Sequence, residues 1–380
     1  MLQRGIAVKK LLVFFCAMLV LVTSARAVEI SAPSALLMEK ATGTVLFAKD
    51  EHAKLEPASV TKVMTILLTM EAIDSGQLTY DTIVTASSHA CSMGGSQIWL
   101  KENEQMSVAD MLKAVCVVSA NDCAVALGEQ ISGSEEAFVE KMNQRAKELG
   151  MNDTTFKNAT GLPAEGHVTS AHDIAIMSRE LILNHPDIRQ YTTIWMDSLR
   201  NGTSELVNTN KLIRFYEGAT GLKTGSTDNA LYCLSGTAER DGMELIAVIM
   251  KDITSAQRFE DAKALLNYGF STYALKTVTP ESPLPPVPVT LGTQATVQPV
   301  LGEGNTLLLE KSSAGDLQQT VTLAESLDAP IVKGDVIGTL LVTSGETTVA
   351  EIPLLAGEDV PRITYRQMLL RLLQTAFLAS

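Results

Sequence analysis

Residues 57–74 read PASVTKVMTILLTMEAID, a proline followed by one long run of mostly apolar side chains. Apolar residues occur at so many positions that they would cover nearly every face of a helix, and a helix that is apolar all round is buried. The pattern predicts a central core helix from Ser59 to about Asp74, with Gly76 as its stop signal. Ser59 and Lys62 are therefore polar groups at the N-terminal end of a buried helix.

Two further polar motifs stand out in the chain, SAN at residues 119–121 and KTG at residues 223–225. SAN interrupts two apolar runs, and KTG is predicted to begin a strand. Each tripeptide alone carries little information, because such combinations occur by chance in many chains of this length. In this order after Ser59 and Lys62, however, they match a known set, S-x-x-K, S-x-N and K-T-G. That set supplies a nucleophile, a base, a proton relay and a carboxylate clamp without a metal or cofactor.

The first motif places a serine and a lysine three residues apart, so their side chains meet on one helix face. A serine hydroxyl is a weak nucleophile until a neighbouring base takes its proton. Lys62 can be that base only if its pKa falls, and burial together with the like charge of Lys223 would lower it. Alone, Ser59 would be read as an N-cap and Lys62 as a solvated charge, but this helix is otherwise predicted to be buried. The backbone N–H groups of Ser59 and Ser226 could form an oxyanion hole.

The side chains of the second and third motifs suit the binding of a peptide. Ser119 can pass a proton, and Asn121 can both donate and accept hydrogen bonds. The structural alternative is a turn between two helices with Asn121 as a cap, and the two roles can coincide. Lys223 and Thr224 can bind a substrate carboxylate through charge-assisted hydrogen bonds. Gly225 would let the substrate backbone approach the edge of the strand.

The elements around the motifs predict an α+β fold, with antiparallel strands at both ends and helices between them. One hairpin is expected where residues 36–39 and 44–47 flank a turn containing Gly43. A second is expected where residues 231–238 and 243–250 flank Asp241-Gly242. Helices are predicted at residues 108–118, 123–132, 134–149, 171–184 and 255–267, and a loop rich in Gly and Pro at residues 158–166.

The N-terminus has the parts of an export signal, which we assign to residues 1–27. Arg4, Lys9 and Lys10 precede an apolar core, and a small-x-small cleavage site ends at Ala27. The apolar core is too short to span a bilayer. Cys16 follows a phenylalanine rather than a small residue, which argues against a lipoprotein anchor. The chain is therefore expected to be exported.

The acidity of the chain excludes one class of function. Its formal net charge is −13, and loss of the four cations of the signal would bring it to −17. Nucleic-acid binding needs a basic surface, so we do not expect this chain to bind nucleic acid. No cluster of histidine and cysteine has the spacing of a metal site, and we predict neither metal nor cofactor. Four cysteines remain after the signal and could pair, but most lie in apolar runs, which favours buried thiols.

Composition changes after residue 276. Residues 279–286 hold four prolines, which make a stiff linker, and the following residues to Leu355 are rich in Val, Thr and Leu with glycine turns. This pattern predicts a small β-rich domain at residues 277–357, a spacer or interaction module behind a catalytic domain at residues 28–276.

The last segment, residues 358–380, is predicted to be an amphipathic helix that lies on a membrane. It carries arginines and no acid from Pro361 onward, with apolar side chains on one helix face and basic or amide side chains on the other. The apolar face is expected to hold Tyr365, Met368, Leu369, Leu372, Leu373 and Ala376, and the polar face Arg366, Gln367, Arg371 and Gln374. A helix docked on its own domain is the alternative.

The motifs and their surroundings resemble those of the low-molecular-mass penicillin-binding proteins, the serine D-alanyl-D-alanine carboxypeptidases of the peptidase S11 type. The similarity lies in PASVTKVMT at residues 57–65, SAND at 119–122, NATGL at 158–162 and GLKTG at 221–225. It runs from about Ser34 to Tyr273. It implies a transpeptidase/β-lactamase-like domain, followed by a β-rich domain that holds it off the membrane.

Carried over to this chain, the resemblance implies removal of the terminal D-Ala from peptidoglycan pentapeptide stems, and acylation by β-lactams. Ser59 would be acylated and Lys62 would be its base, with Ser119 as relay and Asn121 holding the Ser-Lys pair and the peptide amide. Lys223 and Thr224 would meet the substrate with Thr227 nearby, and Arg258 would bind the terminal carboxylate. The protein would act at the outer face of the cytoplasmic membrane.

Two departures from the family pattern concern substrate detail. Leu231 stands where many members have glycine, and Thr209 stands where some have arginine. Neither is expected to touch the three motifs.

Two other functions stay open at this point. One is a class A-like β-lactamase, which uses an E-x-x-L-N motif; residues 180–184 read ELILN, but they lie far from SAN and in a helical run, so we interpret them as a decoy. The other is a non-catalytic penicillin-binding sensor or wall-binding protein, from which only turnover would distinguish an enzyme.

Overall fold

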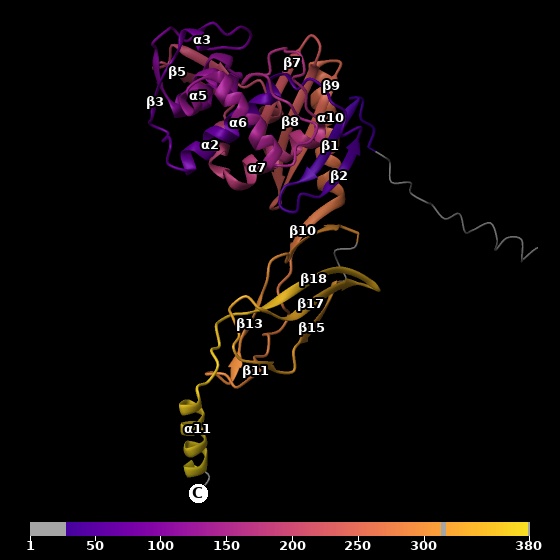
Figure 1. Ribbon diagram of the computed structural model, residues 1–380. Helices are drawn as coiled ribbons and strands as arrows, with labels where there is room; N and C mark the ends of the chain where they lie inside the picture. The colour runs from indigo at the N-terminus through magenta and orange to yellow at the C-terminus, as the bar shows by residue number, and fades with distance from the viewer. Residues whose placement is uncertain (1–27, 313–316, 379–380) are drawn as a thin grey trace, which may run out of the picture.

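The computed structural model describes residues 28–312 and 317–378. The predicted signal at residues 1–27 lies outside this range. The described chain has an upper part with a sheet and most of the helices, a lower part made of strands, and a helix at the far end (Figure 1). This is the predicted α+β domain followed by a β-rich domain.

An antiparallel five-stranded sheet in the order β2-β1-β9-β8-β7 is the frame of the upper part. Its strands are β1 (Ser34–Glu39), β2 (Val45–Lys49), β7 (Ala219–Thr227), β8 (Leu231–Arg240) and β9 (Met243–Asp252). Both predicted hairpins are present, since β1 pairs with β2 and β8 with β9. Asp241 and Gly242 both have positive φ, which suits the tight turn of the second hairpin. Strand β7 is longer than expected, so Lys223 lies within the strand and does not begin it.

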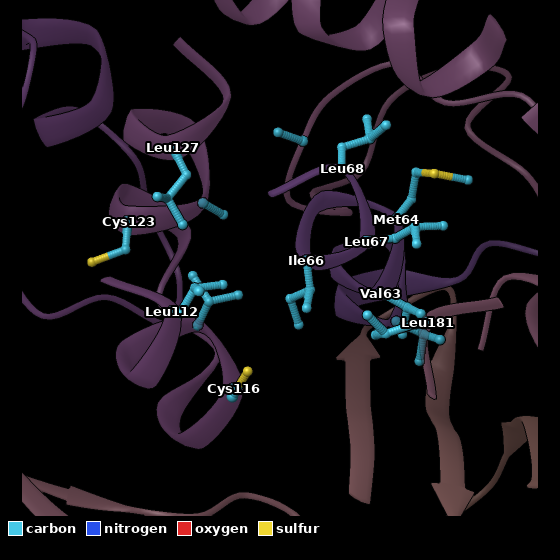
Figure 2. Close-up of a cluster of buried hydrophobic side chains, with 14 of the residues drawn as sticks. Val63, Met64, Ile66, Leu67, Leu68, Leu112, Cys116, Cys123, Leu127 and Leu181 are labelled. Carbon is cyan, nitrogen blue, oxygen red and sulfur yellow. The ribbon is translucent and has the colours of Figure 1, made fainter. Parts of the chain in front are cut away.

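The predicted core helix is present as a 3₁₀ turn, η1 (Ala58–Thr61), that continues into α2 (Lys62–Asp74). Figure 2 shows α2 with Leu112 and Leu127 of neighbouring helices on one side and Leu181 on the other. Every residue from Val60 to Met70 is buried, including Lys62. The all-round apolar pattern therefore predicted the burial of this helix correctly.

Helices cover both faces of the sheet, as Figure 1 shows. The predicted helices are α4 (Val108–Val118), α5 (Asn121–Ser132), α6 (Glu135–Glu148), α7 (Ala171–Asn184) and α10 (Ser255–Thr272). One apolar core joins α2, α4, α5 and α7 to the sheet, and a second lies between the sheet and α10. Helix α10 extends five residues beyond the predicted end at Asn267 and passes directly into β10 (Tyr273–Thr277).

The short elements of the upper part were not predicted, because each lacks a full period of apolar residues. They are β3 (Ile83–Thr85), α3 (Ser88–Cys91), β4 (Gln105–Ser107), η2 (Pro186–Ile188), α8 (Arg189–Thr192), β5 (Met196–Leu199), β6 (Ser204–Val207) and α9 (Leu212–Phe215). Strands β3 and β4 pair with each other, as do β5 and β6.

The lower part is built of short strands around two small apolar cores. Its strands are β11 (Val287–Thr290), β12 (Thr296–Val297), β13 (Pro299–Leu301), β14 (Thr306–Glu310), β15 (Leu317–Leu323), β16 (Leu327–Asp328), β17 (Val336–Ser344) and β18 (Thr347–Ala356). The connection to the upper part is itself a strand, because β10 pairs with β14 along its whole length.

Helix α11 (Tyr365–Leu378) projects from the far end of the lower part (Figure 1). Tyr365, Met368, Leu369 and Leu373 of the predicted apolar face are exposed, while Arg371 on the other face donates hydrogen bonds to the carbonyls of Gly292 and Thr293. None of the helices in the described residues is long and apolar enough to cross a bilayer.

Candidate active site

Ser59 and Lys62 meet as the i, i+3 spacing predicted. Lys62 Nζ lies 2.9 Å from Ser59 Oγ and donates to the carbonyl of Thr160 at 2.7 Å. Thr160 belongs to the predicted loop at residues 158–166, so this loop holds the lysine against the serine. Lys62 is fully buried and Ser59 is partly exposed. The serine hydroxyl is therefore accessible, while the amine beside it is shielded from water.

Burial lowers the pKa of Lys62 well below its ordinary value, and the positive charge of Lys223 lowers it further. Burial also lowers the pKa of Lys223, to about 7. The two lysines thus sit in a site that disfavours the charged ammonium form, as the sequence predicted for Lys62. A neutral Lys62 amine has a lone pair, and at 2.9 Å from Ser59 Oγ it is close enough to accept the proton of that hydroxyl.

The second motif holds two buried polar atoms that have no hydrogen-bond partner among the described residues. Ser119 has a left-handed backbone (φ 64°) at the end of α4, and Asn121 opens α5. The Asn121 amide donates to the carbonyl of Gly94 at 2.6 Å. Among the described residues, Ser119 Oγ and Asn121 Oδ1 are buried without a hydrogen-bond partner. Buried polar atoms are nearly always paired, so these two are free to bind a ligand.

Gly225 explains how β7 reaches the serine. A Cβ on this residue would lie 2.8 Å from the carbonyl oxygen of Pro57 and from the backbone nitrogen of Ser59. The glycine is therefore needed first for close packing of β7 on the 3₁₀ turn, rather than only for the approach of a substrate. Because of this contact, Lys223 and Thr224 lie beside the turn that carries Ser59.

Arg258 lies in α10 and is nearly buried behind β7 and β8. Its guanidinium donates to the carbonyls of Gly225 and Cys233, both at 3.0 Å, and its Nε has no partner among the described residues. Its contact with Gly225 places it next to the third motif. Ser226, one residue on, is exposed, and Thr227 is half-buried at the end of β7.

Thr209 is part of the site, and the prediction that it touches none of the motifs is wrong. Its hydroxyl lies 2.7 Å from that of Thr224, and its backbone N–H donates to the carbonyl of Val117 in α4. It therefore links the third motif to α4, the helix that ends just before Ser119. Leu231 pairs with Thr227 at the β7–β8 turn, two residues beyond the third motif, and has a positive φ of 52°.

The loop opposite β7 contributes residues that the motifs alone did not reveal. Gly161 has φ +81°, and a Cβ there would lie 1.8 Å from the carbonyl oxygen of Ala58. His167 accepts the N–H of Lys157 at Nδ1, so its Nε2 carries the proton toward Thr61 Oγ1 at 2.9 Å. Burial lowers the pKa of His167 to about 4, so it holds the turn as a neutral group. The NATGL stretch was the sequence signal for this loop.

The cysteine side chains of the described residues form no disulfide. Cys116, Cys123 and Cys233 are buried and Cys91 is half-buried, and these four in the described residues are free thiols. Within residues 28–312 and 317–378, no group of histidine, cysteine and acidic side chains could hold a metal ion.

Comparison with known proteins agrees with this geometry. Residues 21–254 match the D-alanyl-D-alanine carboxypeptidase family of peptidases (S11), and residues 276–362 match the C-terminal domain of penicillin-binding protein 5. The chain is 42% identical to the D-alanyl-D-alanine carboxypeptidase DacF of Bacillus subtilis, over 90% of this chain and 88% of that protein.

Two solved structures show the same similarity. Penicillin-binding protein 5 of Haemophilus influenzae superposes with a TM-score of 0.77 and 29% identity, over 88% of this chain and 98% of that one. Penicillin-binding protein D2 of Listeria monocytogenes, in its ampicillin-bound form, superposes with a TM-score of 0.58 and 33% identity, over 63% and 98% of the two chains.

The chain belongs to the peptidase S11 family of D-alanyl-D-alanine carboxypeptidases, with a penicillin-binding protein 5-type C-terminal domain. It is a serine-type D-Ala-D-Ala carboxypeptidase of the bacterial cell wall.

Proposed function

We propose that Ser59 is the nucleophile of this carboxypeptidase and that neutral Lys62 takes its proton. The Ser59 oxygen attacks the carbonyl between the last two D-Ala residues of a peptidoglycan pentapeptide, and the peptide bond to the terminal D-Ala breaks. Ser119 passes a proton toward the departing amine. Water then hydrolyses the acyl-Ser59 ester and releases the shortened stem.

The remaining residues bind and polarise the substrate. Asn121 Oδ1 accepts from the peptide amide, and Lys223 and Thr224 bind the terminal carboxylate. The N–H groups of Ser59 and Ser226 receive the oxyanion of the tetrahedral intermediate, which is usually worth about 10²–10³ in rate per donor. Thr227 and Arg258 support the carboxylate end, Arg258 through its hold on the Gly225 carbonyl.

One observation carries this proposal: a fully buried lysine amine 2.9 Å from an accessible serine hydroxyl. A lysine is almost never fully buried unless it is paired with an acid, and this one faces a hydroxyl and a carbonyl. The depressed pKa that results is what a general base at neutral pH needs.

A fluorescent penicillin and a D-Ala-D-Ala pentapeptide test the mechanism together. We expect the wild-type chain from Val28 to be labelled at Ser59 and to release D-Ala, because both ligands offer a carbonyl to the same nucleophile. Ser59→Ala should lose both activities. Ser75→Ala, at the other end of α2, is the matched control and should keep both. Release of D-Ala at the wild-type rate by Ser59→Ala would show that another residue is the nucleophile.

Two alternatives are less well supported. A class A-like β-lactamase would need Glu180 at the acyl ester, but Glu180 accepts a hydrogen bond from Arg145 of α6 at 2.6 Å, in an ion-pair cluster with Glu71. A non-catalytic β-lactam sensor would be labelled at Ser59 without turnover. Labelling of the wild type with no release of D-Ala would favour the sensor.

We further propose that residues 1–27 direct export and that residues 358–380 attach the protein to the outer face of the cytoplasmic membrane. The domain limits that we propose, 28–276 and 277–357, lie close to the two family matches. The exposed apolar side chains of α11 and its arginines support an interfacial position on anionic lipid.

Liposome flotation tests the anchor. The chain from Val28 should bind vesicles of anionic phospholipid, and a chain that ends before Pro361 should stay in solution while cleaving pentapeptide at the wild-type rate. Leu369→Glu, which places a charge on the exposed apolar face, should also weaken binding to the vesicles. If the longer chain ignores anionic vesicles, the anchor proposal is wrong.

A further inference from the structure

A cleft of about 1090 Å³ adjoins the candidate active site. Its walls are the loop at residues 95–104 and the turn between β5 and β6. It reaches the second motif at two points. Val118 lines the cleft immediately before Ser119, and the carbonyl of Ser96 accepts the backbone N–H of Asn121 at 2.7 Å. A ligand in the cleft would therefore be continuous with one held at Ser119 and Asn121.

The loop is built to expose one aromatic side chain, that of Trp99. Trp99 is 73% exposed and has a positive φ of 58°, which is a strained conformation for a bulky residue. The N–H groups on either side of it, of Ile98 and Leu100, both donate to the buried carboxylate of Asp122, at 3.1 and 3.0 Å. The backbone on both sides of Trp99 is therefore fixed to α5, while the indole itself faces solvent. Backbone strain of this kind persists where the surroundings enforce it and is concentrated at ligand sites.

Arg200 braces the same loop from the other wall. Its guanidinium binds both oxygens of Glu104, at 2.7 and 3.2 Å, and donates to the carbonyl of Ile98 at 2.9 Å. The two walls are thus joined by a bidentate ion pair, the more rigid form of such a contact. The cleft does not depend on a ligand to hold its shape.

The groups lining the cleft suit a neutral, polar ligand. Three carboxylates, of Glu102, Glu104 and Glu205, outnumber two cations, and Arg200 is already bound to one of them. A ligand rich in negative charge would be repelled. Amide and hydroxyl side chains, including Gln97, Asn103 and Thr203, can donate to and accept from hydroxyl and acetamido groups. An exposed indole offers a flat apolar face to the C–H side of a sugar ring.

We propose that this cleft binds the glycan of peptidoglycan, with an N-acetylated sugar ring stacked on Trp99. The inference rests on the proposed function, since it places the sugar end of the substrate whose D-Ala end lies at Ser59. The enzyme then prefers stems still attached to a glycan over free peptides. Asp122 is a positioning residue in this scheme: it holds the Trp99 loop from the same helix end that presents Asn121.

Kinetics with two substrates test the proposal in the chain from Val28. The first substrate is a sugar-free D-Ala-D-Ala pentapeptide, and the second is the same pentapeptide on its N-acetylated disaccharide. For Trp99→Ala we expect KM for the disaccharide substrate to rise about tenfold, as the loss of one aromatic contact would give, with kcat unchanged. The sugar-free peptide should change by less than about twofold, and Trp99→Phe should restore most of the preference.

Phe215→Ala is the matched control, because Phe215 is an aromatic side chain of similar exposure (65%) that does not line the cleft. It should leave both substrates unaffected. Equal KM values for the two substrates in wild type and Trp99→Ala would overturn the proposal. An equal loss with the sugar-free peptide would mean that the cleft binds peptide, which also overturns it.

Fluorescence separates this inference from the mechanism. The chain has two tryptophans, so Trp195→Phe leaves Trp99 as the sole reporter. Peptide-free glycan strands should shift the emission of Trp99 in the Ser59→Ala, Trp195→Phe protein, in which acylation cannot occur. A shift without D-Ala release by the wild type would reject the mechanism and keep the glycan site. No shift would reject the site whatever the enzyme does.

Discussion

Lys62 and Lys223 have the same intrinsic basicity, but their surroundings suit them to different functions. Lys62 faces the Ser59 hydroxyl and the carbonyl of Thr160, while Lys223 donates to the carbonyl of Thr224. Both are buried, so both ammonium forms are disfavoured, and the positive charge of Lys223 disfavours that of Lys62 further. In the proposed mechanism Lys62 must be neutral to act as a base, and Lys223 must be charged to bind a carboxylate.

The two lysines predict a bell-shaped pH profile of kcat/KM for pentapeptide cleavage. Activity should rise as Lys62 loses its proton and fall again near pH 7 as free-enzyme Lys223 loses its own, since its pKa is about 7. Lys223→Arg should be slower but should lose the alkaline limb, because a guanidinium stays charged. An alkaline limb still near pH 7 in Lys223→Arg would assign that limb to another group.

Single residues also show where sequence reasoning failed. From the sequence, Thr209 is expected to touch none of the motifs, yet its hydroxyl lies 2.7 Å from that of Thr224. The sequence predicts that Gly225 lets a substrate approach, but its missing side chain first allows the protein's own turn at residues 57–60 to pack against β7. Both contacts depend on which distant segments pack together, and the local sequence does not determine that packing.

Among the elements, the site forms where the 3₁₀ turn before α2 packs between β7 and the loop at residues 158–166. We call this packing the clasp. Gly225 makes the contact from one side and Gly161 from the other, each against backbone atoms of the turn. Neither contact can relax by moving a flexible side chain, so both glycines position Ser59.

Replacing Gly161 tests this clasp. Gly161→Ala places a Cβ 1.8 Å from the Ala58 carbonyl and forces a left-handed alanine, so we expect a loss of about 3 kcal/mol or more in the free energy of unfolding. Gly76→Ala is the matched control: its φ is similar, +77°, but the space around it is open, and it should cost only about 1 kcal/mol. Urea unfolding measures both. Equal losses would show that backbone strain alone, and not the clasp, sets the cost.

Longer elements were predictable and shorter ones were not. The limits of α4 and α7 agree with the sequence prediction, and the Asp241-Gly242 turn marked its hairpin. These elements carry several apolar periods or a specific turn pair. The β3–β4 and β5–β6 hairpins carry neither, and the second of them forms a wall of the cleft beside the site.

For the whole molecule, the two parts have separate apolar cores joined by the β10–β14 pairing. All the proposed catalytic and binding residues lie in the upper part. The lower part and α11 extend away from it, with α11 at the far end (Figure 1). This shape suits a lower part that acts as a spacer.

A shortened chain of residues 28–276 tests the independence of the upper part. A unit with its own core should fold alone, so penicillin acylation should stay within about twofold of the full chain. The melting temperature should fall modestly, because Leu275 would lose its partner Leu308 on β14. An insoluble or unreactive product would show that the lower part is needed for folding, and the proposed limit between the domains would then be wrong.

Local sequence was enough to predict the α+β class, the buried helix and the serine–lysine pair, because helix periodicity and i, i+3 spacing act within a few residues. Only the tertiary structure brings the carbonyl of Thr160 to Lys62, Thr209 to Thr224, and the two tight glycines onto one turn. Such contacts join segments up to 166 residues apart, Ser59 and Gly225 among them, and arise from the packing of whole elements. The depressed lysine pKa values follow from that packing, because the degree of burial belongs to the folded molecule.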